Sequence, residues 1–335
     1  MDFGPVQTEH ALGAILAHSV EVGGRRLRKG VVLEQSHIEQ LLAANLAEVT
    51  VARLGDDDVH EDDAALALAQ ALVPDAAAAN LRLGAVGTGR CNIFADAAGV
   101  AQIDAAAIDA LNAIHPMITV STVPKLHRMG AGGMVATVKI ISYAVPGAAL
   151  AQACDAAAGA LGLQRPVMRR AGFVETCIPG DGEGPVGDKG YRMMQARLDR
   201  LQVAMSDPVN APHRATPLAQ AITACKDELI LILTGSATSD ITDVAPEAVR
   251  QAGGEILHFG MPVDPGNLLF LGRIGTQWVI GLPGSARSPA VSGVDWVLER
   301  VICGLPVSAE DIMGMGVGGL LKEIPTRPQP RRPQG

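Results

Sequence analysis

The most constraining feature of this sequence is a short apolar run at residues 228 to 233, ELILIL, which ends in a loop of small and polar residues. An apolar run of this length, bounded by turn residues, is typical of a strand that is buried on both faces. The loop that follows, TGSATSD, is rich in hydroxyl groups. Open α/β sheets bind their ligands beyond the carboxyl ends of the strands, so this loop is a candidate binding segment.

From about residue 166 onwards, the apolar pattern alternates between strand-like and helix-like periodicity. We expect strands at 171–178, 228–233, 255–259 and 279–282, and helices at 189–201, 218–225 and 246–252. Such alternation indicates an α/β fold, here a mostly parallel sheet with helices on both faces. Smaller α+β and β-rich units are expected upstream, beginning with a short helix at 8–17.

Changes in pattern divide the chain into segments, and 335 residues can hold two or three domains of ordinary size. We predict an N-terminal α+β unit at 1–75, a β-rich middle unit at 76–150, an α/β domain at 165–305 and a C-terminal extension at 306–335. The extension ends in TRPQPRRPQG, a polar, proline-rich composition that is typical of disorder.

Composition excludes several classes of partner. The formal net charge of −8 argues against a nucleic-acid or anionic-membrane partner, and an aromatic content of 3% is too low for a base-stacking platform. The five cysteines form no CxxC pair, so neither a disulfide framework nor a zinc site is indicated. We therefore expect a cytoplasmic protein that has neither a nucleic-acid nor a membrane partner.

A second candidate loop, GLPGSARSP, follows the expected strand at 279–282. A helix beginning near Pro289 would direct free N–H groups and its positive dipole end at this loop, which would make an anion site. An ordinary strand-to-helix connection explains the same residues equally well. In the middle unit, two roles are open for Thr88, Arg90 and Asn92. They either bind a polar ligand or are simply part of a glycine-rich hairpin.

The run LILTGSATSDITDVAPEAVRQAGGEILHFGMPVDPGNLLFLG, followed by VIGLPGSARSP, resembles the molybdopterin-binding domain of molybdenum cofactor biosynthesis proteins. The resemblance covers about residues 168 to 305 and is closest to the molybdopterin molybdotransferases. It also extends to the pterin-binding half of proteins fused to a cytidylyltransferase. The family implies that the loops bind molybdopterin or its nucleotide form.

The resemblance assigns binding roles to three loops. The matching residues are Thr234, Gly235 and Ser236 in the first loop, Pro265, Gly266 and Asn267 in the second, and Pro283, Gly284, Ser285 and Arg287 in the third. Asp240, Asp243 and Asp188 are the catalytic candidates, and Asp240 and Asp243 are candidate Mg²⁺ ligands because hard cations prefer carboxylate oxygen. Each aspartate has an alternative role as a helix or turn cap.

Four positions depart from the family pattern. The usual TGDEL-like loop is replaced by IPGDGEGPVGD at 178–188, a glycine by Ser236, and two asparagines by Gly190 and Ser285. Ligand binding survives such changes more readily than catalysis does.

Three functions remain open at this point. The first is molybdopterin binding with Mg²⁺-dependent insertion of molybdenum from molybdate as substrate. The second is a non-enzymatic carrier that delivers the cofactor to a cytidylyltransferase or a molybdoenzyme. The third is an unrelated nucleotide-binding α/β protein. The resemblance also implies a homo-oligomer.

Overall fold

The computed structural model describes residues 1–178 and 188–321. The chain divides into two compact units. The first comprises Met1–Ala97 and Ala101–Leu163, and the second begins at Gln164 and includes the short segment Ala98–Val100. The mixed α/β class, with one large multi-stranded sheet, is confirmed.

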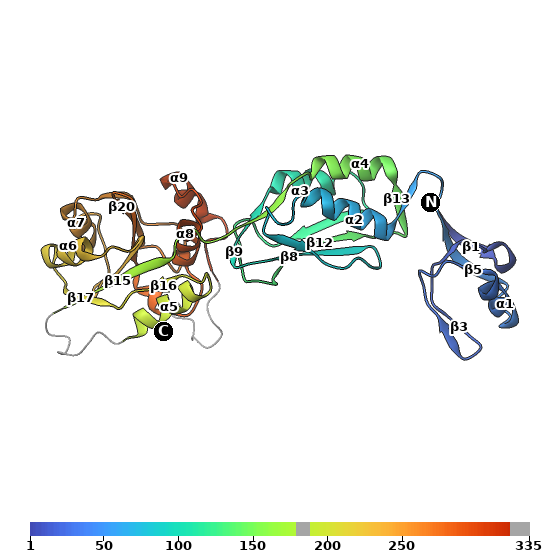
Figure 1. Ribbon diagram of the computed structural model, residues 1–335, viewed down its shortest axis with the longest axis horizontal. Helices are drawn as coiled ribbons and strands as arrows, with labels where there is room; N and C mark the ends of the chain where they lie inside the picture. Colours follow the sequence, from blue (N-terminus) through green and yellow to red (C-terminus); the bar gives the residue numbers. More distant parts are fainter. Residues whose placement is uncertain (179–187, 322–335) are drawn as a thin grey trace, which may run out of the picture. The chain divides into compact units, whose positions relative to one another are not determined.

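The N-terminal part of the first unit is built on a small antiparallel sheet with the strand order β1-β5-β2 (Figure 1). Its elements are β1 (Asp2–Gln7), η1 (Thr8–His10), β2 (Ile15–Leu16), β3 (Val20–Val22), β4 (Arg25–Leu27), α1 (Gln35–Ala43) and β5 (Glu48–Arg53). The helix predicted at 8–17 is wrong. A single 3-10 turn ends at His10, Gly13 then adopts a left-handed φ of 77°, and Ile15 and Leu16 pair with β5.

The rest of the first unit contains a four-stranded sheet, β10-β12-β8-β7, and a three-stranded sheet, β11-β9-β14. Its elements are β6 (Asp58–His60), α2 (Glu61–Leu72), β7 (Leu81–Leu83), β8 (Arg90–Ala95), β9 (Gly99–Ile103), α3 (Ala105–Asn112), β10 (Ile118–Thr122), β11 (Arg128–Met129), β12 (Met134–Ile140), β13 (Ala144–Pro146), α4 (Gly147–Ala156) and β14 (Leu161–Gln164).

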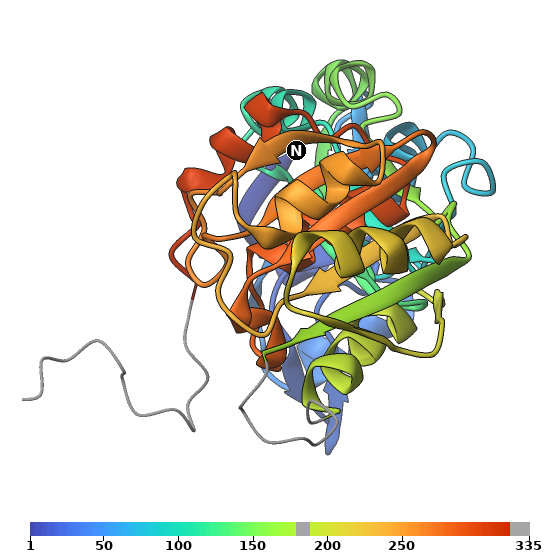
Figure 2. The same ribbon diagram turned by 90° about the vertical axis from the view of Figure 1, so that its left-hand side faces the viewer.

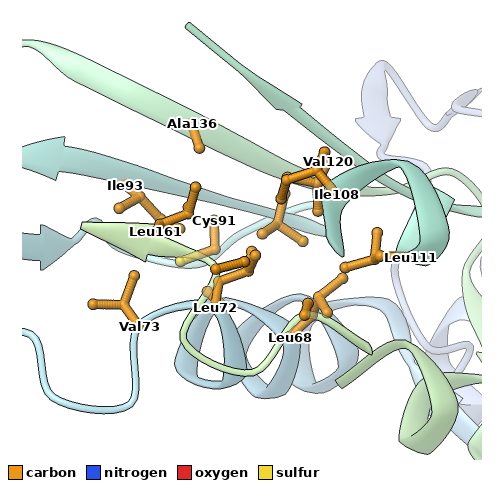
Figure 3. Close-up of a cluster of buried hydrophobic side chains, with 14 of the residues drawn as sticks. Leu68, Leu72, Val73, Cys91, Ile93, Ile108, Leu111, Val120, Ala136 and Leu161 are labelled. Carbon is orange, nitrogen blue, oxygen red and sulfur yellow. The ribbon is translucent and has the colours of Figure 1, made fainter. Parts of the chain in front are cut away.

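Helix α2 begins with three consecutive acids, which complement the positive end of its dipole. Its apolar face packs on the strands of the four-stranded sheet, and Leu68 and Leu72 lie in one cluster with Cys91 and Ile93 of β8 (Figure 3). The predicted boundary at residues 75 and 76 therefore separates α2 from the sheet on which it packs.

The second unit carries the large sheet, with the strand order β16-β15-β18-β21-β20-β19 and β17 paired to β15. Its elements are β15 (Arg170–Cys177), α5 (Lys189–Asp199), β16 (Ala204–Met205), β17 (Val209–Pro212), α6 (Ala215–Ala224), β18 (Leu229–Leu233), α7 (Val244–Gln251), β19 (Glu255–Phe259), β20 (Phe270–Ile274), β21 (Gln277–Leu282), η2 (Gly284–Arg287), α8 (Gly293–Ile302), α9 (Ala309–Met313) and η3 (Gly314–Gly316).

The pairing is parallel from β16 and β17 through β15 and β18 to β21, and antiparallel from β21 to β20 and from β20 to β19. Every residue of β18 is buried, as the apolar run predicts. Figure 2 shows α6 and α7 across one face of the sheet, where Leu218, Ile222 and Val249 pack on the strands. The described residues contain no helix that is both long and apolar enough to span a membrane.

Candidate functional site

Strands β18 and β21 end level with one another, and the neighbouring parallel strand β15 runs two residues further. Glu175 of β15 pairs with Leu233 of β18, and Leu233 pairs with Leu282 of β21. Strand β17 ends beside Cys177. The segments that follow these strands therefore leave the same carboxyl edge of the sheet, which is where α/β folds place their ligands.

The loop after β18 is anchored by its first two residues. Thr234 is buried and its hydroxyl lies 3.3 Å from that of Thr238. The Gly235 N–H donates to the Thr176 hydroxyl over 2.9 Å. A Cβ atom on Gly235 would lie 2.7 Å from the Thr176 carbonyl oxygen, so only glycine allows this close approach. The loop and β15 are thus locked together at the edge.

The next residues of this loop offer unused donors. Among the residues that the structure describes, the backbone N–H groups of Ser236, Ala237 and Thr238 donate no hydrogen bond. The Ser236 side chain, which replaces a glycine of the family pattern, is exposed. Free backbone N–H groups such as these can donate to the oxygens of an anion.

Asp243 and Asp240 both make local hydrogen bonds. The Asp243 carboxylate caps α7, because it accepts from the Val244 N–H over 2.7 Å and from the Ser239 N–H over 2.9 Å. Asp240 Oδ1 accepts from the Thr242 hydroxyl and from the Thr242 N–H over 2.8 Å. These bonds lower the pKa of Asp240, so its carboxylate stays ionised well below neutral pH. The capping alternative is confirmed for Asp243.

The connection between β19 and β20 carries Pro265, Gly266 and Asn267. The Pro265 carbonyl accepts from the Gly293 N–H at the start of α8 over 2.9 Å. A Cβ atom on Gly266 would lie 2.8 Å from the Gly293 nitrogen. The Asn267 side chain donates to the Met261 carbonyl over 3.2 Å. This loop packs on the start of α8, and these bonds do not join it to the loop after β18.

The loop after β21 differs from its prediction. Residues Gly284–Arg287 form the 3-10 helix η2, and α8 begins only at Gly293, so the helix expected near Pro289 is wrong. Ser292 and Asp295 form a capping box there, and Asp295 Oδ2 accepts the Ser292 N–H. The capped start of α8 therefore cannot offer the anion site that the sequence suggested.

Ser285 and Arg287 lie on η2, beside the loop after β18. Arg287 donates from one terminal nitrogen to the Thr234 carbonyl and to the Glu175 carboxylate, both over 3.1 Å. Its other guanidinium N–H groups have no partner among the described residues. The Ser285 hydroxyl is covered, and it likewise lacks a partner there. The third loop thus adds a cation to the edge, with a covered hydroxyl beside it.

Glu175 was missed at the sequence level. Its side chain is 4% exposed, and burial raises its pKa although the Arg287 guanidinium opposes the shift. A carboxylate within an otherwise apolar strand, GFVETC, was the available signal. A buried charge of this kind must be paired, and here it orients the arginine of the third loop.

Arg197 of α5 was also missed, although it supports the same loop. Its side chain is 5% exposed and forms an ion pair with Asp295 over 3.0 Å. It also donates to the carbonyls of Ala286, Ser288 and Ala290 over 2.9 to 3.0 Å. The signal was an arginine on the helix face that carries Met194 and Leu198. Five guanidinium donors can hold an irregular loop that has few bonds of its own.

The segment that joins β15 to α5 carries two predictions, and neither is tested. Residues 179–187 of the loop IPGDGEGPVGD lie outside the described residues. Asp188 precedes α5 and forms an exposed i,i+4 pair with Arg192 over 2.8 Å, without capping the helix through its side chain. Its catalytic role stays a prediction.

Thr88, Arg90 and Asn92 lie in the first unit on the β7–β8 hairpin. Arg90 donates to the Thr137 hydroxyl over 3.0 Å, and Thr137 donates to the Asn92 side chain over 2.7 Å. The Thr88 carbonyl accepts from Lys139. These contacts favour the hairpin alternative. A hollow of about 690 Å³ in this unit is lined by other residues, Lys125 and Asp104 among them.

A magnesium ion at this edge would find one free carboxylate oxygen on the two aspartates predicted to bind it. Mg²⁺ in proteins often takes one or two carboxylates, several waters and the phosphates of a substrate. Asp240 Oδ2 accepts no hydrogen bond from the described residues, whereas both Asp243 oxygens do. The described residues contain no group of three or more His, Cys, Asp or Glu side chains suited to a metal. Of the two aspartates, only Asp240 therefore keeps a carboxylate oxygen without a hydrogen bond from the described residues.

Comparison with protein families matches a short part of the chain. Residues 5–53 match a model described as a domain of unknown function (DUF8806). No curated protein matches the sequence.

Comparison with solved structures finds molybdenum cofactor biosynthesis proteins. Molybdenum cofactor biosynthesis protein B shares 16% identity, covering 41% of this chain and 89% of its own, with a TM-score of 0.28. A molybdopterin biosynthesis MoeA protein from Pyrococcus horikosii shares 12%, covering 94% and 76%, with a TM-score of 0.29. A molybdenum cofactor biosynthesis protein from Pyrococcus furiosus shares 11%, covering 93% and 65%, with a TM-score of 0.25.

Proposed function

We propose that the carboxyl edge of the large sheet binds the phosphate-bearing end of molybdopterin, or of its nucleotide form. The observation that carries this proposal is the combination of two sets of unused donors. The N–H groups of Ser236 to Thr238 and the free N–H groups of Arg287 belong to loops that the Arg287–Thr234 hydrogen bond joins. Such a set suits an anion with several oxygens.

The Arg287 charge supports a phosphate ligand over a neutral one, whereas the carboxylates of Asp240 and Asp243 on the neighbouring loop would favour a cation beside it. Glu175 neutralises part of the Arg287 charge, but it is buried beneath the guanidinium and accepts from only one of its nitrogens. The remaining N–H groups can therefore form charge-assisted bonds to phosphate oxygens, each stronger than a neutral hydrogen bond. The sequence resemblance of the TGSATSD and GLPGSARSP loops names the pterin as the rest of the ligand.

We further propose that the edge assists molybdenum insertion, with molybdate as substrate. Asp240 would hold Mg²⁺, which would neutralise phosphate charge as the activated pterin is cleaved. Arg287 and the loop N–H groups would orient the phosphate and stabilise its developing charge, so that no side-chain nucleophile is required.

A carrier function is the second candidate, and Asp243 is the observation that favours it. Both of its carboxylate oxygens already accept backbone N–H groups, which leaves Asp240 alone of the two proposed metal ligands with a free oxygen. A carrier needs only the binding contacts. It would pass the cofactor to a cytidylyltransferase or a molybdoenzyme, and the second copy of a homo-oligomer stays a further proposed partner.

Catalytic turnover distinguishes the molybdenum-insertion function from the carrier function. Purified protein is incubated with adenylylated molybdopterin, molybdate and Mg²⁺, and nucleotide release is followed at several protein concentrations. Release in excess of the protein supports insertion, whereas stoichiometric binding without release supports the carrier. If the wild-type protein fails to bind the adenylylated pterin at any concentration tested, both are wrong.

Arg287→Ala is the matched test of the binding edge, with Arg273→Ala as its control. Arg273 lies on β20 of the same sheet, and its guanidinium stacks over the Trp278 ring. We expect Arg287→Ala to weaken binding of the adenylylated pterin by about ten-fold or more, since a charge-assisted bond contributes about 1.5–3 kcal/mol. Arg273→Ala should leave the affinity unchanged.

A further inference from the structure

Thr176 connects the ligand loop to a histidine that the proposed function does not use. It is the penultimate residue of β15 and is fully buried. Its hydroxyl oxygen accepts the Gly235 N–H over 2.9 Å and lies 2.9 Å from His213 Nδ1. His213 follows β17 directly, and its own N–H donates to the Cys177 carbonyl. Residues from three segments thus meet at one hydroxyl.

The limited number of hydrogen-bonding positions on a hydroxyl makes the contacts of Thr176 directional. A threonine hydroxyl has one donor and two acceptor positions. Gly235 occupies one acceptor position, and His213 Nδ1 either accepts the hydroxyl proton or donates to the second acceptor position. In both arrangements the oxygen stays turned toward Gly235. The Gly235 peptide is therefore held in one orientation from the strand side.

The orientation of the Gly235 peptide determines the direction of the backbone N–H groups that follow it. Because the Gly235 N–H is occupied by Thr176, it is not available to a ligand. The next three N–H groups, from Ser236 to Thr238, donate no hydrogen bond among the described residues and depend on the preceding peptide for their direction. Rotation of the Gly235 peptide would change the direction of the N–H groups that follow it in the loop.

We propose that Thr176 and His213 are positioning residues for the phosphate loop, Thr176 by holding the Gly235 N–H and His213 by holding the Thr176 hydroxyl. The inference rests on the proposed function for the identity of the ligand. Neither side chain touches the ligand. Their effect is transmitted through the loop.

The first experiment uses ligand-free protein, so that it does not depend on the proposed function. Amide hydrogen exchange at Gly235 is measured in wild type and in Thr176→Val, which keeps the side-chain shape but removes the acceptor. We expect exchange to accelerate at least ten-fold in Thr176→Val, and Thr176→Ser to stay near wild type. Thr223→Val removes a hydroxyl that bonds only within α6 and is the matched control. Unchanged Gly235 exchange in Thr176→Val overturns the inference.

The role of His213 is tested by replacing it with each of the two residues that carry a side-chain amide, asparagine and glutamine. Asparagine can place a polar atom near the Nδ1 position, whereas glutamine places it near Nε2. We expect His213→Asn to keep slow Gly235 exchange and His213→Gln to accelerate it. Equal acceleration in both variants would show that the ring acts by packing alone, which overturns the role of His213.

The second experiment measures the affinity for adenylylated molybdopterin. We expect Thr176→Val to raise the Kd about ten-fold, with rescue by Thr176→Ser and a melting temperature close to wild type. Wild-type affinity in Thr176→Val overturns the inference. If the wild-type protein binds no adenylylated pterin, the proposed function fails, and the exchange of Gly235 alone decides whether Thr176 and His213 position the loop.

Discussion

The Arg287 guanidinium lies 3.1 Å from the Glu175 carboxylate and 3.1 Å from the Thr234 carbonyl. A residue of the loop after β21 is thereby tied to β15 and to the end of β18. These segments are far apart in the sequence and adjacent only because their strands are parallel neighbours. The ion pair ties these segments together and leaves the other Arg287 donors without a partner among the described residues.

Glu175 should make the stability of the protein fall as the pH rises. Burial raises the pKa of this carboxyl above its ordinary value of 4.5. Between that value and the raised pKa, the folded state holds a proton that the unfolded state has lost, so the free energy of unfolding decreases with rising pH. The contribution of Glu175 to the free energy of unfolding is fully present below about pH 4.5. It is lost as the pH rises through the raised pKa of the folded state.

Glu175→Gln is the variant that checks this sign. Glutamine keeps an oxygen that can accept from Arg287 but does not titrate. Urea unfolding of both proteins from pH 4 to pH 8 should show wild type losing stability relative to Glu175→Gln as the pH increases. A difference of the opposite sign would mean that Arg287 outweighs burial.

Arg197→Met should be strongly destabilising. It leaves the buried Asp295 carboxylate without its ion-pair partner and removes the donors to three loop carbonyls. We expect a loss of about 3 kcal/mol or more in the free energy of unfolding, as for other broken buried pairs. Arg192→Ala on the same helix breaks a pair with Asp188 that is more than half exposed, and it should cost less than about 1 kcal/mol. Similar losses in the two variants would contradict the role of Arg197.

Much of the large sheet was predictable because its strands are short, apolar and separated by helices. The run at 228–233 appears as β18, and the helices expected at 189–201 and 246–252 appear as α5 and α7 within a few residues. Local pattern suffices where burial and propensity agree.

The contacts that complete the site were not predictable in the same way. The pairings of Arg287 with Glu175, and of Thr176 with His213, depend on strand order, which no local pattern specifies. The helix expected at Pro289 failed because the capping box of Ser292 and Asp295 starts α8 later. Resemblance named the loops, but only the fold shows which side chains join them.

Gly281→Ala tests the packing beneath the third loop. Gly281 lies on β21 opposite Phe270 of β20, and a Cβ atom there would overlap the fully buried Phe270 ring. Because this ring cannot move into solvent, we expect a loss of about 1–3 kcal/mol from overpacking. Gly284→Ala, three residues later, meets nothing within 4 Å and should change stability by less than about 0.5 kcal/mol. Thermal or urea unfolding compares the two.

Substitutions at Asp240 and Asp243 should have different effects, because Asp240 is proposed to bind the ligand's Mg²⁺ whereas Asp243 caps α7. Asp243→Ala removes the cap of α7 and should cost about 1 kcal/mol of stability. Asp240→Asn keeps an oxygen for its bonds from Thr242 but loses the carboxylate charge. If Asp240 holds Mg²⁺, the asparagine variant should lose the Mg²⁺ dependence of adenylylated pterin binding while its melting temperature stays near that of wild type.

The measurement is a titration of the adenylylated pterin at several Mg²⁺ concentrations. For Asp243→Ala we expect lower stability with Mg²⁺ dependence retained, since α7 still follows the loop and Asp240 still offers its free oxygen. Magnesium dependence that disappears only in Asp243→Ala would reverse the assignment. Affinity that is independent of Mg²⁺ in wild type and in both variants would favour the carrier, because binding by Arg287 and the loop N–H groups requires no metal.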